Sequence, residues 1–121
     1  MPYSPRTTAV IQTTILNGAA ISGVIQMADF AMGSVILPAA WTAASIAFKV
    51  CDTFGGTYVP LRTSAGAIVE ITGPATGASA AYPLPAELLP CQYFKIWSAA
   101  AGAGTDTNQG ADRAITVMLK S

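Results

Sequence analysis

A strict alternation of apolar and polar residues in the middle of the chain constrains the fold more than any other feature. In Ser45–Cys51, the side chains of Ile46, Phe48 and Val50 point to one side, and the intervening residues point to the other. A period of two is typical of a β-strand with one buried face. Residues 52–61 continue with Asp-Thr-Phe-Gly-Gly, which favours a turn, and then with a second β-rich run. The sequence therefore predicts a β-hairpin with an apolar inner face.

Short β-rich segments of this kind recur along the whole chain. The predicted strands cover residues 8–16, 21–27, 35–37, 45–51, 57–61, 67–72, 80–84, 91–98 and 114–120. Asn17-Gly18 predicts a tight turn from which the second segment returns, and the prolines that bound residues 85–90 predict one helical turn. Eight or nine short strands without a long helix predict an all-β fold: a single-domain, antiparallel β-sandwich. A jelly roll is the leading arrangement and an immunoglobulin-like sandwich is the second.

The first six residues differ from the rest. Pro2 and Pro5 have no backbone N–H, so this segment cannot donate to a β-ladder there. We expect residues 1–6 to form an extended arm and residues 7–121 to form the domain. An arm of this kind either lies across a neighbouring subunit or is a frayed terminus. In the first case its contact residues are Pro2, Tyr3, Pro5 and Arg6.

Charged residues are scarce, at 12 of 121, with six basic and six acidic side chains. A typical globular chain of this length has about 30. With 52% hydrophobic residues and a mean hydropathy of +0.49, we expect much of the exterior to be covered by protein, either copies of this chain or another protein. The alternative is a surface weakly covered by Ala, Thr, Ser and Gly.

Nucleic acid and membrane are not expected partners. Six dispersed basic residues do not form a nucleic-acid groove. The uncharged runs 7–28 and 30–48 are long enough to span a bilayer. However, Asn17-Gly18 interrupts the first run, and Gly33 and Pro38 interrupt the second.

Catalytic, cofactor-binding and metal-binding residues are not predicted. The chain has no histidine, which excludes triads that use histidine as the base. Its six acidic residues stand mostly in turns, without a recognisable catalytic pair. Cys51 and Cys91 are expected to be packed, reduced thiols, with a disulfide between them as the alternative. The sequence thus favours a protein that is not an enzyme.

Aromatic residues offer a further candidate contact. Tyr93 and Trp97 share the outward side of the predicted strand 91–98. We expect them to pack between the sheets or to contact protein at a subunit interface, which makes both candidate protein-contact residues; the alternative is that, with Tyr58, they form a stacking platform for a sugar. Trp41 is expected in the core.

Several segments together resemble the small virion proteins of tailed bacteriophages that act as capsid decoration, or cement, proteins. They are residues 36–44 (I-L-P-A-A-W-T-A-A), 48–50, 55–58, 93–96 and 108–113. The resemblance implies a jelly-roll sandwich that sits as a dimer or trimer on the outside of the phage head and clamps neighbouring capsomers. It implies the major capsid protein as partner, the virion as location and no cofactor. The alternative functions are a carbohydrate- or receptor-binding module and a tail or adaptor ring protein.

Overall fold

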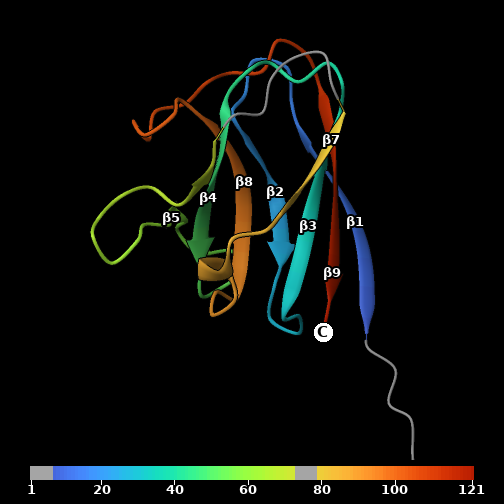
Figure 1. The fold of residues 1–121 in the computed structure, drawn as a ribbon, viewed down its shortest axis with the longest axis vertical. Helices are drawn as coiled ribbons and strands as arrows, with labels where there is room; N and C mark the ends of the chain where they lie inside the picture. The colour runs from blue at the N-terminus through green and yellow to red at the C-terminus, as the bar shows by residue number, and fades with distance from the viewer. Residues whose placement is uncertain (1–6, 73–78) are drawn as a thin grey trace, which may run out of the picture.

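The computed structural model describes residues 7–72 and 79–121. Within these ranges the chain forms nine β-strands and one 3-10 helical turn (Figure 1). The elements are β1 (Thr8–Ile15), β2 (Ile21–Gln26), β3 (Met32–Leu37), β4 (Ser45–Cys51), β5 (Val59–Pro60), β6 (Glu70–Ile71), β7 (Ala80–Pro83), η1 (Ala86–Leu88), β8 (Tyr93–Ala99) and β9 (Arg113–Lys120).

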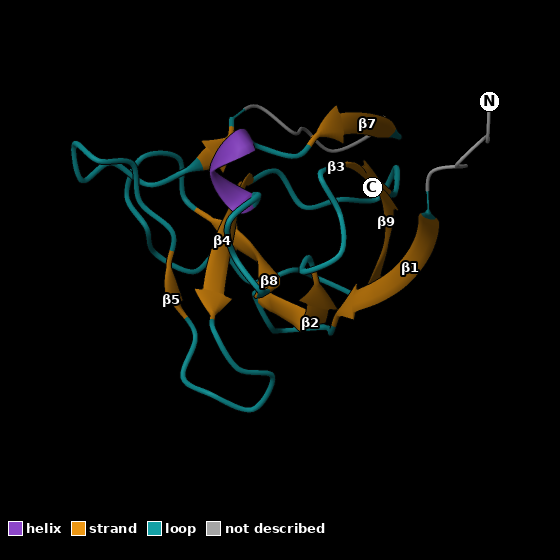
Figure 2. Ribbon diagram, turned by 90° about the horizontal axis from the view of Figure 1, so that it is seen from below, coloured by secondary structure: helices purple, strands orange, loops and turns teal. Residues whose placement is uncertain are grey.

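The strands form two sheets that pack face to face. The first sheet has the order β1-β9-β3-β7, and the second has the order β2-β8-β4-β5, with β6 also paired to β4. Every pairing is antiparallel. Figure 2 looks along the sandwich, with β7, β3, β9 and β1 on one side and β2, β8 and β4 on the other. The predicted all-β sandwich of short antiparallel strands is confirmed.

The core follows directly from the alternation in the strands. In β9 the side chains of Ile115, Val117 and Leu119 are buried, as the pattern predicts. From the opposite sheet, Phe48 and Phe94 meet edge to face with ring centroids 6.0 Å apart. Trp41, also predicted in the core, is fully buried, as are further residues of both sheets: Ile15, Ile25, Val35, Ile46 and Ile96.

The Asn17-Gly18 turn exists, but it does not close a hairpin. β1 pairs with β9 and β2 pairs with β8, so the turn carries the chain from one sheet to the other. This crossing lets Ile15 and Ile25 enter one core from opposite sheets. Gly18 adopts a left-handed φ of 77°, which glycine accepts without strain, and its N–H donates to the Gln109 carbonyl at 2.8 Å.

The predicted central hairpin is present but short. β4 pairs with β5 at only two positions, Lys49↔Pro60 and Val50↔Val59, whereas it pairs with β8 along its whole length. The prediction of a single buried face is wrong for the first half of β4. Ser45 and Ala47 point away from the core and are nevertheless buried. Ala47 packs with Trp97 and Ala99 in a second hydrophobic cluster on this side.

Candidate protein-interaction surfaces

The outer face of the first sheet is almost uncharged. The strand register places Val10 beside Met118, Met118 beside Ser34, and Ser34 beside Pro83. Val10 is 70% exposed and Met118 is 38% exposed. Among the outward side chains of these four strands, Lys120 carries the one charge. We call this surface the β1–β9 face.

A shallow groove of about 520 Å³ runs over one end of the β1–β9 face. Its lining comes from the start of β1 and β3, the last residue of β7 and the end of β9: Thr8, Ala9, Val10, Met32, Gly33, Ser34, Pro83, Met118, Leu119 and Lys120. Exposed apolar groups bordering a groove favour contact with another apolar surface. The sequence signal for this surface was that the outward positions of 8–16 and 114–120 contain a single charge, Lys120.

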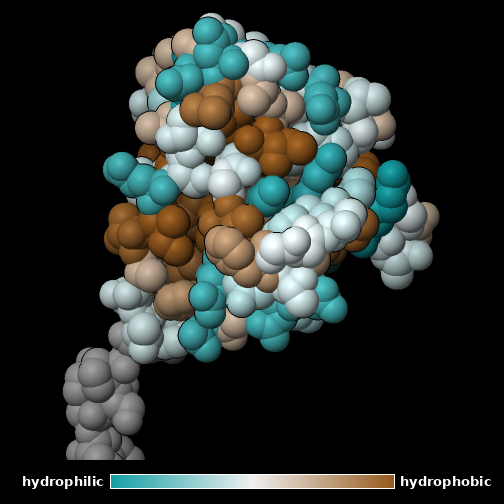
Figure 3. All heavy atoms as spheres, turned by 180° about the vertical axis from the view of Figure 1, so that it is seen from behind, coloured by the Kyte–Doolittle hydropathy of each residue, from teal (hydrophilic) through white to brown (hydrophobic). Residues whose placement is uncertain are grey.

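Seen from behind, the molecule also exposes hydrophobic residues with few charges between them. In Figure 3, hydrophobic residues gather on the β1 side of the molecule and again across its middle, with hydrophilic residues scattered between them. The total accessible surface is 6357 Å², which leaves about one charged residue per 530 Å² for the 12 in the sequence. In the part of the chain that the structure describes, seven large hydrophobic side chains are exposed: Val10, Leu16, Met32, Phe54, Val59, Leu89 and Met118.

Trp97 lies on the outer side of the second sheet but is not available to a partner. Its indole is 2% exposed, and Nε1 donates to Asp106 Oδ1 at 2.7 Å. Lys49 Nζ stands 4.7 Å from the ring centroid, and Ala47 and Ala99 pack against it. The prediction that Trp97 contacts another protein is therefore wrong, because the chain after β8 folds back over the ring.

Tyr93 keeps an accessible position beside the loop after β4. Its ring meets Phe54 edge to face at 5.9 Å, and Phe54 is 66% exposed. Tyr58 is engaged elsewhere: Lys95 Nζ stands 4.5 Å from its ring centroid, and its hydroxyl donates to the Phe54 carbonyl at 2.8 Å. Desolvation, assisted by Cys51 and Tyr93, raises the Tyr58 pKa. The three predicted aromatics thus do not form one open platform, and Tyr93 stays a candidate protein contact.

The other predicted contact residues, Pro2, Tyr3, Pro5 and Arg6, lie outside the described residues. The loop after β8 is anchored to the domain by hydrogen bonds of Asp106 and Gln109.

Gln109 and Asp106 hold this loop from within, and neither role was predicted from the sequence. Gln109 is 1% exposed. Its Nε2 donates to Ser98 Oγ at 2.8 Å, and its Oε1 accepts from the Thr42 N–H at 2.8 Å. Asp106 accepts from Trp97. The sequence signal that could have indicated these anchoring roles was the presence of polar residues in a segment otherwise rich in Ala and Gly.

Three of the six acidic side chains hold loops in place. Glu70 Oε1 accepts from the Gly102 N–H at 2.9 Å, and Asp112 Oδ1 accepts from the Asn17 N–H at 2.8 Å. Together with Asp106, they fix loops to neighbouring segments. Such pairing is a structural use of carboxylates rather than the convergence of two of them on a substrate.

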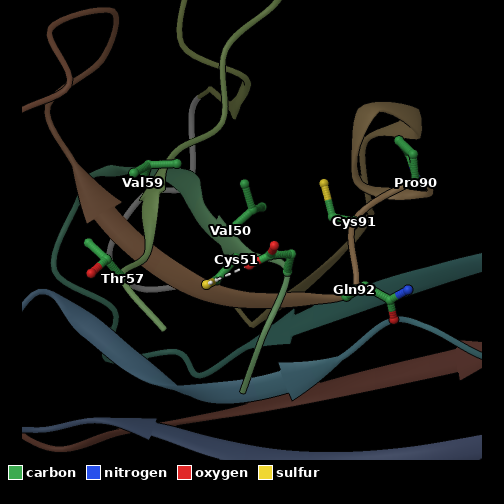
Figure 4. Close-up of a pocket in the computed structure, with 8 residues that line it drawn as sticks. Val50, Cys51, Thr57, Val59, Pro90, Cys91 and Gln92 are labelled. Atoms are coloured by element: carbon green, nitrogen blue, oxygen red, sulfur yellow. Dashed lines mark hydrogen bonds between the residues drawn. The ribbon is translucent and has the colours of Figure 1, made fainter. Parts of the chain in front are cut away.

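A second cavity, of about 400 Å³, lies at the end of β4 (Figure 4). It is lined by Val50, Cys51, Asp52, Thr57, Val59, Pro90, Cys91 and Gln92. Both cysteines are free thiols, as favoured from the sequence, and in Figure 4 their sulfur atoms point in different directions. Across the described residues, no cluster of three or more potential metal ligands occurs.

The Cys91 thiol is expected to alkylate more slowly than a free cysteine. Burial raises its pKa, so a smaller fraction is thiolate, the reactive form, at any pH near 8 to 9. We expect the pH at which iodoacetamide labelling reaches half its limiting rate to lie above that of a cysteine peptide. Peptide mapping by mass spectrometry across pH 7 to 10 measures this for each thiol. A half-rate pH at or below the peptide's value would contradict the effect of burial.

Fold and surface together define a small antiparallel β-sandwich with an apolar outer face. No family model and no curated protein matches the chain. Among solved structures it is similar to the SPBc2 prophage-derived protein YomS, with a TM-score of 0.57 and 11% sequence identity over 100% of this chain and 99% of that one. At this identity the likeness shows a shared fold. Within the described ranges, the structure contains no helix of the length and apolarity that crossing a membrane requires.

Proposed function

We propose that this chain is a structural virion protein of a tailed bacteriophage, a decoration protein that binds the outside of the head and clamps neighbouring capsomers. The observation that carries the proposal is the β1–β9 face, where Val10, Met32 and Met118 are exposed and Lys120 is the one outward charge. An apolar, nearly uncharged sheet face is suited to lasting contact with protein. The fold shared with a prophage-derived protein supports a phage setting.

The path of the chain supports the jelly-roll form of the sandwich. β1 is followed by β2 in the opposite sheet, and β3 is followed by β4 in the opposite sheet. The last strand, β9, returns between β1 and β3, and β8 returns between β2 and β4. This interleaving is what two nested Greek keys produce.

The proposed mechanism is cementing by repeated contacts of moderate strength. The β1–β9 face, the arm 1–6 and the Tyr93–Phe54 corner would contact the major capsid protein or another copy of the chain. A standard interface buries about 800 Å² per partner, and contacts repeated over a lattice add through multivalency. No reaction is assigned to the chain. The alternative function, a sugar-binding module, is not favoured, because Trp97 is buried and cannot stack on a sugar.

Binding to phage heads is expected to depend on the β1–β9 face. Met118→Lys adds a charge at the centre of this face, where the aliphatic stem can lie along the surface and preserve folding. We expect about a tenfold loss of affinity, because an apolar contact is replaced by a charge that must be desolvated. The measurement is sedimentation of labelled protein with expanded heads of its own phage from which the protein has been removed.

Leu89→Lys is the matched control, since Leu89 is an exposed apolar residue in the turn after η1. It should bind heads as the natural chain does. Deleting residues 1–6 should also lower occupancy without lowering the melting temperature. A chain that shows no saturable binding to these heads would remove the proposal, and so would equal binding by Met118→Lys and the natural sequence.

A further inference from the structure

Three of the four sheet edges in the described part of the chain are protected against pairing with another strand. The edge formed by β5 and β6 consists of two-residue strands and contains Pro60. β7 has four residues and ends with Pro83. β2 is interrupted by a register shift between Ile21 and Val24, and its Gly23 N–H already donates to Thr13 Oγ1 at 3.0 Å. Short strands, prolines and bulges are the usual ways of blocking an edge.

The fourth edge, β1, has none of these protections. Its eight residues pair with β9 in an unbroken register and include no charge, no proline and no glycine. In Figures 1 and 2, β1 stands at the margin of its sheet. β2 of the other sheet approaches the last residues of β1, and no described strand pairs with its outer side. A long, uncharged edge without a bulge is a template for a further strand.

The free main-chain groups of β1 follow from its pairing. The Ser121 N–H donates to the Thr7 carbonyl at 2.9 Å, so the groups of Thr7 face β9. Because the groups alternate sides along a strand, those of the even-numbered residues face away from β9. These residues are Thr8, Val10, Gln12 and Thr14. No described residue forms a main-chain hydrogen bond with them on that side.

We propose that β1 pairs antiparallel with β1 of a second copy across a two-fold axis, which joins the two first sheets into one continuous sheet. The register that uses every free group places Thr8 opposite Thr14 and Val10 opposite Gln12, with Ile11 at the axis. Four N–H groups from each copy then make eight hydrogen bonds between the chains. The proposal rests on the self-association contained in the proposed function and names its surface.

A second copy fits this edge because the edge is self-complementary. The two-fold places no like charges opposite each other, since residues 8–15 carry none. It also places Ile11 against its own counterpart at the axis and Ala9 against Thr13 of the second copy. Ala9 and Ile11 point inward but are only partly buried at the sheet margin. A symmetric dimer uses the same patch on both subunits, and addition of a strand supplies main-chain hydrogen bonds without needing a charged partner.

The experiment combines sedimentation with hydrogen exchange on the full chain. From about 1 μM to about 500 μM, the mass should rise from 12.3 kDa to twice that value. In the same range the amides of Thr8, Val10, Gln12 and Thr14 should become protected. In the monomer these four amides should exchange freely, while those of Ala9, Ile11 and Thr13 stay protected by β9.

Two variants test the edge itself. Val10→Pro removes an N–H that faces the partner and leaves the β9 ladder intact, so we expect dimerisation to weaken about tenfold or more. Val10→Lys combined with Gln12→Lys keeps the backbone and places lysines opposite each other across the axis, with a similar expected loss. Met118→Lys is the control: it changes the β1–β9 face but not the edge, and dimerisation should stay within about threefold.

A chain that remains monomeric at about 500 μM would overturn the proposal. So would an oligomer in which the four even-numbered amides exchange freely, or a dimer that both edge variants leave unchanged. These results are separate from head binding. A monomer that binds heads refutes the edge pairing alone, whereas a β1-paired dimer that binds no head refutes the proposed function alone.

Discussion

Replacing Gln109 by leucine is expected to lower the free energy of unfolding by about 3 kcal/mol, although leucine fills similar space. The amide of Gln109 is the shared partner of three segments. Its Oε1 accepts from the Thr42 N–H at 2.8 Å and from Arg113 Nε at 3.2 Å, and its Nε2 donates to Ser98 Oγ at 2.8 Å and to the Thr42 carbonyl at 3.2 Å. Leucine leaves the part-buried Thr42 main-chain groups and the buried Ser98 hydroxyl without this partner. An unsatisfied buried polar group costs about 1 to 3 kcal/mol.

Urea unfolding monitored by tryptophan fluorescence measures the loss, and the melting temperature should fall by roughly 10 °C. Asn108→Ala is the matched control, because Asn108 is the exposed neighbour in the same loop. It should change stability by less than about 0.5 kcal/mol. If Gln109→Leu cost no more than this control, the network would not hold the loop.

Replacing Trp97 by alanine is expected to cost about 3 to 5 kcal/mol of stability, the range for removing a buried aromatic side chain. The substitution empties the space between β4 and the loop after β8, and it also leaves Asp106 without the indole donor. We therefore expect the amides of residues 100–107 to exchange faster in the variant, beyond the change in global stability.

Tyr93→Ala is the comparison, because Tyr93 is on the same strand and the same side but only half-buried. It should cost about 1 kcal/mol. The pair of variants separates the two outward aromatics: a loss of head binding in Tyr93→Ala indicates contact, whereas one in Trp97→Ala follows from damage to the domain. Equal and small costs for the two would show that Trp97 is as open as the sequence pattern alone predicts.

Part of the candidate interaction surface could be predicted from the sequence, and part could not. The sequence alone predicts the shortage of charge and the outward position of Met118. The structure places Met118 on the β1–β9 face. The free edge of β1 cannot be predicted from the sequence, because the residue pattern of 8–15 is compatible with an edge strand and with a central strand. Only the pairing of β1 with β9 on one side identifies the other side as open.

The sequence by itself determined where the strands run and which way their side chains point. Ile115, Val117 and Leu119 lie inward as their spacing predicts, since alternation along a strand is a local property of the backbone. Only the tertiary structure decided which strands pair and which outward residues are covered. β1 takes its partner from the far end of the chain, and Trp97 is buried by a loop. Both outcomes depend on contacts between distant segments, whose free energy no single segment contains.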